Sequence, residues 1–158
     1  MKTLLLARHA KSDWGDPGLA DFDRPLNARG LRDAPVMARR LVDDGAAVQL
    51  VVSSPALRAI TTAREYAAAF GAGLVERPEL YAASARTILA AAAALPDEAS
   101  VAMLVGHNPG MSDAVAELTG EFVELPTCAV VACAVDVGSW AELIEGSGRL
   151  ELVRTPRD

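Results

Sequence analysis

The sequence predicts an α/β protein: a three-layer α/β/α sandwich with a mainly parallel central sheet. Short apolar runs alternate along the chain with longer segments in which apolar residues recur at helical spacing. Strands that alternate with helices form a parallel sheet with helices on both of its faces. The chain has 158 residues, of which 51% are hydrophobic, so we expect one domain over 1–158 whose core needs no disulfides or metals.

The N-terminal elements are a strand, a long loop and a helix. Residues 3–8 form a nearly continuous apolar run, which is typical of a strand buried on both faces. A polar loop follows over 9–26, and the spacing of apolar residues then predicts a helix over 28–44. Pro35 would kink this helix, or its regular part would start nearer to Asp33.

The middle of the chain predicts two more strands around a second helix. Residues 49–53 form the second strand. Ser54 and Pro55 are typical of an N-cap and a first helical position, so we expect a helix from here to about Phe70. Residues 73–77 follow as a third strand.

The remaining elements continue the alternation. An alanine-rich helix is expected over 84–94, a buried strand over 100–105 and a helix over roughly 111–119. A long strand over 128–136 comes next. Residues 149–154 alternate polar and apolar side chains, which predicts a strand at the edge of the sheet.

Charge and composition exclude several classes of protein. A net charge of −6 argues against binding to nucleic acid or to an anionic membrane, because both favour basic stripes. No apolar run approaches the ~18–20 residues that cross a membrane. The apolar start reaches Arg8 too soon for a signal peptide, so we expect a cytoplasmic protein. Abundant Ala and Arg with only two Lys, Lys2 and Lys11, indicate a GC-rich, bacterial genome.

The two cysteines are not expected to form a disulfide. Cys128 and Cys133 lie in one predicted strand at a spacing that directs them to opposite faces. We therefore expect two buried thiols.

Three predicted strand ends carry the residues that suggest chemistry. Arg8 and His9 end the first strand, Arg58 lies about one turn into the helix after the second, and His107 follows the strand over 100–105. The crevice of a parallel sheet lies beyond these strand ends. Two arginines and two histidines suit a phosphoryl dianion, and the helix start near residue 110 would add backbone N–H donors.

A phosphoryl-transfer site also needs a nucleophile. The expected pocket contains histidine but no suitably placed cysteine, and an imidazole attacks only when it is neutral. Arg8 and Arg58 would favour the neutral form, because a nearby cation disfavours a second one. The same guanidinium groups, together with His107 if it is protonated, would stabilise the charge that develops on the phosphoryl oxygens.

These residues resemble a known family. Residues 6–12 (LARHAKS) look like the Arg-His-Gly signature of the histidine phosphatase superfamily, with Ala10 where glycine is usual, and residues 53–59 and 105–110 are also similar to it. Further segments resemble the small SixA-like phosphohistidine phosphatase branch: 21–27, 29–30, 80–84 and 126–127. The resemblance runs from residue 3 to about 154.

The resemblance implies a phosphoglycerate mutase-like fold and a phosphatase mechanism. His9 would be the nucleophile and would form a covalent phosphohistidine, which water then hydrolyses. Arg8, Arg58 and His107 would hold and neutralise the phosphoryl group.

It also implies supporting roles in the long loop. Ser12 and Asn27 would line the pocket and donate further hydrogen bonds. Arg24 either forms an ion pair with Asp23 that shapes the loop or contacts the substrate, and Trp14 packs or forms a wall of the pocket. No metal and no other cofactor is expected, because the chain lacks the usual clusters of His and Cys ligands.

The general acid and the substrate stay open between alternatives. Glu79 is the nearest candidate for the acid that larger relatives use, unless it is a solvated carboxylate. A phosphohistidine substrate needs a strong acid less, because it expels an imidazole with a reference pKa of about 6.5. We therefore expect a phosphorylated signalling protein, such as a phosphotransfer domain, as the partner. The alternatives are a small phosphomonoester with Glu79 as the acid, and an inactive phosphate-binding module, which Ala10 would suggest.

Overall fold

A central six-stranded sheet organises the protein. The computed structural model describes residues 1–157. The strand order is β3-β2-β4-β1-β5-β6, in which β1 to β4 run parallel and β5 runs antiparallel to both of its neighbours, β1 and β6. The sheet is therefore mainly parallel, as predicted. The strand bounds are β1 Lys2–Arg8, β2 Leu50–Ser53, β3 Gly73–Glu76, β4 Val101–Gly106, β5 Val130–Val135 and β6 Gly148–Arg154.

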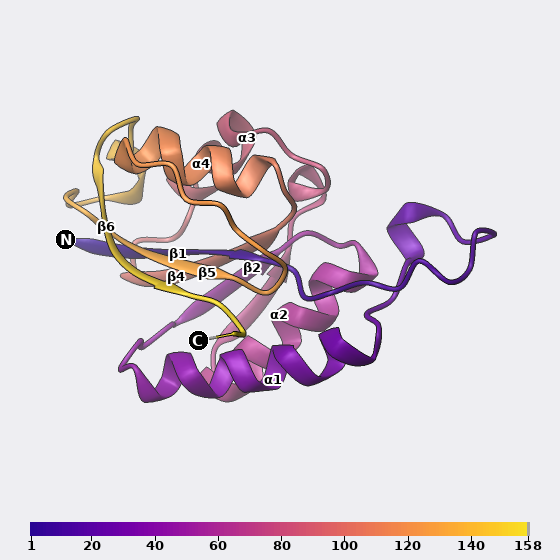
Figure 1. Cartoon of the computed structure of the whole chain (residues 1–158). Coiled ribbons are helices and arrows are strands. Elements are labelled where there is room, and N and C mark those ends of the chain that lie inside the picture. Colours follow the sequence, from indigo (N-terminus) through magenta and orange to yellow (C-terminus); the bar gives the residue numbers. More distant parts are fainter. Residues whose placement is uncertain (158) are drawn as a thin grey trace.

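Helices cover both faces of this sheet (Figure 1), which confirms the three-layer architecture. On one face α1 (Ala28–Asp43) packs against α2 (Leu57–Phe70), and on the other α3 (Ala85–Ala93) packs against α4 (Gly110–Thr119). Short 3-10 helices occur at η1 (Asp21–Asp23), η2 (Pro78–Leu80) and η3 (Trp140–Glu142). No helix within residues 1–157 is long and apolar enough to cross a membrane.

The apolar run of β1 is continuous because both of its faces are buried. Leu4 and Leu6 belong to the core under α3 and α4, whereas Leu5 and Ala7 belong to the core under α1 and α2. Successive side chains of a strand point to opposite faces, so a strand between two helical layers needs apolar residues at every position. This burial fixes the position of the residues that follow β1.

Two sequence-based expectations about the helices need correction. Helix α1 is regular from Ala28 with Pro35 inside it, so its regular part does not start at Asp33. Helix α2 begins at Leu57 rather than at Ser54 and Pro55. Ser54 does accept a hydrogen bond from the amide of the next but one residue (3.3 Å), but it stands in a turn before the helix.

The fifth strand is also shorter than expected. It begins at Val130, and Cys128 precedes it with a φ of 67°, a left-handed conformation. Cys128 and Cys133 are both free and buried and belong to the two opposite cores, as predicted. Burial raises the pKa of each thiol to about 12, so neither is a thiolate near neutral pH.

One segment protrudes from the sandwich. The arm, defined here as residues 13–23, extends to the right in Figure 1, away from the helices and strands. Its base is an antiparallel pair: Ser12 bridges Leu26, and the amide of Asp13 donates to the carbonyl of Pro25 (2.8 Å). The arm therefore leaves the fold shortly after β1 and rejoins it just before α1.

Candidate active site

A cavity of about 210 Å³ lies at the carboxyl ends of β1 and β4, where a parallel sheet is expected to carry its site. All four residues that the strand ends predicted line it, and two further cations join them. The histidines are His9 and His107, and the cations are Arg8, Lys11, Arg24 and Arg58.

The two histidines meet because of the register between β1 and β4. Arg8 pairs with Gly106 as the last couple of the parallel ladder, and the amide of His9 donates to the Gly106 carbonyl (3.1 Å). His9 and His107 therefore leave the sheet side by side, with ring centroids 5.3 Å apart. Sheet hydrogen bonds thus set the spacing of the two imidazoles.

His9 is held as a neutral imidazole with one nitrogen free. Its Nδ1–H donates to the carbonyl of Ala10 (2.7 Å), so the lone pair is on Nε2, which has no hydrogen-bond partner among the described residues. Burial lowers the pKa of His9 to about 3, and the charges of Arg58 and Arg8 act in the same direction. Such a nitrogen is competent as a nucleophile near neutral pH.

His107 is also neutral. Arg58 Nη2 donates to its Nδ1 (3.3 Å), and its Nε2–H donates to Ser54 Oγ (2.8 Å). Burial, followed by the charge of Arg58, lowers the pKa of His107 to about 4. The sequence left open whether His107 is protonated, and in the protein alone it is not, because an imidazolium here would lie buried beside a guanidinium.

The two predicted arginines each have an unused donor. Arg8 Nη1 donates to the carbonyl of Leu125 (2.9 Å), and Arg58 Nη1 donates to the carbonyl of Asp21 (2.7 Å). Within residues 1–157, the Nε atoms of both arginines are buried without a hydrogen-bond partner. A buried donor without a partner is costly, and a phosphoryl oxygen is an acceptor that suits a guanidinium.

Asp21, at the end of the arm nearest to the cavity, was not predicted from the sequence. Its Oδ2 accepts from Tyr81 Oη (2.6 Å) and Arg58 Nη2 (3.0 Å), and its Oδ1 accepts from Arg24 Nε and Nη2 (3.1 and 3.0 Å). The hydrogen bond from Tyr81, followed by those from Arg24 and Arg58, lowers the pKa of Asp21. One carboxylate thus fixes two guanidinium groups at the mouth of the cavity.

Arg24 joins the arm to the floor of the cavity. Its Nη1 donates to Ser12 Oγ (2.5 Å), and its guanidinium carbon lies 3.5 Å from the ring centroid of Trp14, a cation–π contact. Ser12, Arg24 and Trp14 all line the cavity. The expected ion pair with Asp23 is wrong, since the partner of Arg24 is Asp21.

Ala10 fits the position where glycine is usual in the resembling family. Its side chain is fully buried, its amide donates to Thr62 Oγ1 (3.0 Å), and its carbonyl orients His9. Gly30 is the glycine that this region does require, because a Cβ there would collide with the backbone carbonyl of Lys11. The methyl group of Ala10 therefore gives no structural reason for an inactive site.

Two predicted site residues lie outside the cavity lining. Asn27 is the N-cap of α1 and accepts a hydrogen bond from the amide of Gly30 (2.9 Å). Glu79 is exposed on η2 and borders a different hollow, beside β2 and β3.

The start of α4 also falls outside the lining. The amide of Ser112, in its first turn, donates to Oδ1 of Asn108 (3.1 Å), and Gly110 packs against the carbonyl of Ala83. The expected backbone donors near residue 110 therefore do not face the cavity.

Four residues that no prediction assigned belong to the site. Lys11, Asn108 and Thr127 line the cavity, and Ser54 holds His107. Lys11 and Asn108 stand within two residues of His9 and His107, so proximity in sequence was a usable signal. Ser54 was interpreted as a helix cap, and this interpretation hid its contact with His107.

Comparisons with known proteins found sequence relatives and similar structures. The model of the histidine phosphatase superfamily (branch 1) matches residues 4–85. An uncharacterized protein of Mycobacterium tuberculosis is 33% identical over 163 residues, which cover 95% of this chain and 99% of the relative. An uncharacterized chloroplastic protein of Arabidopsis thaliana is 32% identical over 160 residues, covering 93% of this chain and 72% of the relative.

Solved structures share the whole fold. A protein of Agrobacterium tumefaciens assigned as phosphohistidine phosphatase SixA is 31% identical, with a TM-score of 0.84 over 98% of both chains. A SixA assignment from Nakamurella multipartitia has the same identity and TM-score, with 98% and 96% covered. The mycobacterial glucosyl-3-phosphoglycerate phosphatase Rv2419c, 16% identical with a TM-score of 0.71 over 96% and 98%, shares the fold alone. The predicted phosphoglycerate mutase-like fold is confirmed.

Proposed function

This chain belongs to the histidine phosphatase superfamily, and we propose that it removes the phosphoryl group from phosphohistidine in a signalling protein, such as a phosphotransfer domain. The observation that carries the proposal is the free Nε2 of a neutral His9 in a cavity lined by four cations. The likeness to proteins assigned as phosphohistidine phosphatases, at 31% identity, supports the choice of substrate.

The reaction has two displacement steps. In the first, Nε2 of His9 forms a bond to phosphorus while the bond to the leaving imidazole breaks. The substrate ring carries a proton from solvent on its other nitrogen, so it leaves as a neutral imidazole that keeps the electron pair of the broken bond. In the second, a water oxygen bonds to phosphorus as the bond to His9 breaks, the water gives up a proton to solvent, and His9 recovers its lone pair.

The cations of the cavity stabilise the charge on the phosphoryl oxygens. Arg8 and Arg58 line the cavity with guanidinium groups that suit phosphoryl oxygens, and Lys11 and Arg24 add positive charge. We propose on this basis that the reaction needs no metal. Prolonged treatment with a chelator is expected to leave kcat unchanged.

The lining of the cavity favours a good leaving group. Within residues 1–157 no carboxylate lines it, and Glu79 lies outside it. An imidazole leaves without a strong acid, whereas an alkoxide requires one. A small phosphomonoester with Glu79 as the acid, and an inactive phosphate-binding module, therefore have less support.

The test compares two substrates in two proteins. We would measure dephosphorylation of a histidine-phosphorylated phosphotransfer domain and hydrolysis of an activated aryl phosphate, with the wild type and with His9→Ala. The expected result is much faster clearance of phosphohistidine by the wild type and no turnover of either substrate by His9→Ala. Turnover of the aryl phosphate alone would make the substrate a small phosphomonoester. Full activity in His9→Ala would overturn the mechanism, and binding of phosphate without turnover would indicate the inactive module.

A further inference from the structure

The arm exposes large apolar side chains to solvent. Every residue from 13 to 23 is exposed, including Trp14 at 71%, Leu19 at 41% and Phe22 at 39%. Exposed apolar groups at three positions of one short segment indicate an interaction site more strongly than a single exposed residue does. The arm therefore has a surface that a core function does not explain.

These side chains stand at the entrance of the cavity. Trp14 lines it directly. Phe22 makes an edge-to-face contact with Tyr81, with centroids 5.2 Å apart, and Tyr81 makes the same kind of contact with His107 at 5.5 Å. A macromolecule whose phosphoryl group reached His9 would therefore lie against the arm.

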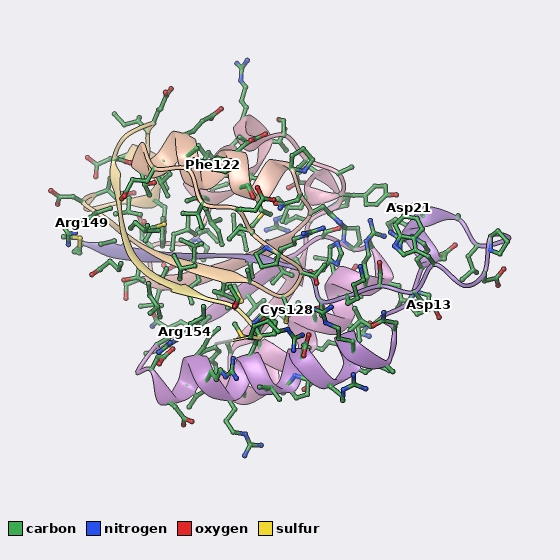
Figure 2. All side chains as sticks on the ribbon, viewed as in Figure 1. Asp13, Asp21, Phe122, Cys128, Arg149 and Arg154 are labelled. Carbon is green, nitrogen blue, oxygen red and sulfur yellow. The ribbon has the colours of Figure 1, made fainter. Side chains whose placement is uncertain are left out.

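The arm is also acidic. It contains four aspartates and no lysine or arginine: Asp13, Asp16, Asp21 and Asp23. Figure 2 shows Asp13 and Asp21 on the protruding segment, with Arg149 at the other end of the molecule. Asp21 is neutralised by Arg24 and Arg58, so the other three give the outer surface its charge. A partner that complements this surface carries apolar side chains flanked by basic ones.

We propose that the arm docks the phosphorylated protein, by contacting an apolar and basic surface next to the phosphorylated residue. This inference rests on the proposed function, and it adds the chemistry by which the substrate protein is recognised. The cavity would then bind the phosphoryl group, while the arm recognises the residues around it.

Two substitutions test the arm without touching the cavity. Leu19→Ser removes an apolar side chain near the tip of the arm. Asp16→Asn removes a charge but keeps the side-chain oxygen that accepts from the amide of Gly18 (2.9 Å), so the local turn is retained. The matched control is Ile144→Ser with Glu145→Gln, an equivalent change in two adjacent exposed residues between η3 and β6.

The substrates are two phosphohistidine peptides of equal length and one small molecule. One peptide flanks the phosphohistidine with leucine and lysine, the other with serine and glutamate, and the small molecule is phosphoramidate. The wild type is expected to prefer the leucine–lysine peptide, and the arm double variant to lose about fivefold to tenfold in kcat/KM on it, mainly through KM. Its kcat/KM on phosphoramidate is expected to stay within about twofold, as that of the control variant does on all three.

The outcomes separate the two proposals. Equal rates of the wild type on both peptides, or an equal loss by the arm variant on peptide and phosphoramidate, would overturn the docking role while phosphohistidine turnover stands. Failure of the wild type to turn over any P–N substrate, with an aryl phosphate still hydrolysed, would overturn the proposed function and the docking role with it. Raised ionic strength is expected to reduce the preference of the wild type for the lysine-flanked peptide, since exposed charges are screened.

Discussion

The floor of the cavity is held by the hydrogen bonds of the sheet, whereas its mouth is held by side chains. On the floor, the pairing of β1 with β4 sets His9 beside His107, and both are buried. At the mouth, an exposed arm is held to the cavity by Asp21, Arg24 and Trp14. The register of paired strands can change only by whole residues, whereas side chains that hold each other can shift by small distances. The floor therefore suits chemistry that needs fixed distances, and the mouth suits recognition.

The strongest way to break this comparison is to remove His9, the proposed nucleophile, from the floor. His9→Ala is expected to lower kcat/KM on every substrate by at least about a thousandfold, because both ring nitrogens of His107, the other neutral imidazole in the cavity, are engaged in hydrogen bonds. Acid-quenched and alkali-quenched reactions with a radiolabelled phosphoryl group would show an acid-labile phosphoenzyme in the wild type and none in the variant. A phosphoenzyme in His9→Ala would place the covalent step on another residue.

The free energy of unfolding should depend on pH differently for the two regions. The pKa values of His9 and His107 are lowered from 6.5 to about 3 and about 4, so below pH 6.5 the unfolded chain binds more protons than the folded one. The free energy of unfolding then falls with falling pH, by at most about 1.4 kcal/mol per pH unit for each histidine. Asp21 at the mouth has its pKa lowered from 3.8, so its contribution is lost only at lower pH.

Denaturant unfolding between about pH 7 and pH 5 measures this slope, and His9→Gln is expected to remove about half of it. An unchanged slope in the variant would show that His9 is not neutral in the folded protein.

Arg58 joins the floor to the mouth, because it contacts both His107 and Asp21. Arg58→Lys keeps the charge but cannot make both contacts, so kcat/KM is expected to fall about a hundredfold on phosphoramidate and on peptides alike. Arg64→Lys, the same change at an exposed position of the same helix, is the control. Near-normal activity in Arg58→Lys would mean that the site needs only a positive charge at this position and not the several donors of a guanidinium group.

Asp21 should matter less, since it acts through the arginines. Asp21→Asn keeps a group that can accept hydrogen bonds but removes the charge that pairs with Arg58 and Arg24, so kcat is expected to fall about tenfold on phosphoramidate. Asp23→Asn, in the same 3-10 helix, is the matched control. A loss on peptides without one on phosphoramidate would assign Asp21 to docking instead of to the position of the arginines.

The same division explains what the sequence could predict. Arg8, His9 and His107 were found because buried strands are recognisable and a parallel sheet brings their ends together. Asp21 was not found, because its contacts depend on how an irregular loop folds back onto α2. The roles of Asn27 and Ser54 were exchanged: Asn27 was predicted to line the pocket but caps α1, and Ser54 was predicted to cap a helix but contacts His107. A side-chain oxygen near the start of a helix can serve either purpose. The three motifs that suggested the superfamily, at 6–12, 53–59 and 105–110, follow or include the ends of strands at the floor, where backbone geometry places the residues.

Glu79 gives the smallest expected effect and the sharpest limit on the substrate. It lies on η2 beside another hollow, so Glu79→Gln is expected to change kcat/KM on phosphohistidine and on an aryl phosphate by less than about twofold, as Glu76→Gln on the neighbouring strand should. An alkyl phosphate is the informative third substrate, because its alkoxide leaves only when protonated. If Glu79→Gln lowers activity steeply on the alkyl phosphate alone, η2 moves to the mouth during turnover and the enzyme hydrolyses phosphomonoesters. If the wild type itself hardly acts on the alkyl phosphate, the absence of a carboxylate among the described residues of the cavity lining determines specificity. A cavity without a general acid then accepts only substrates whose leaving groups need no protonation.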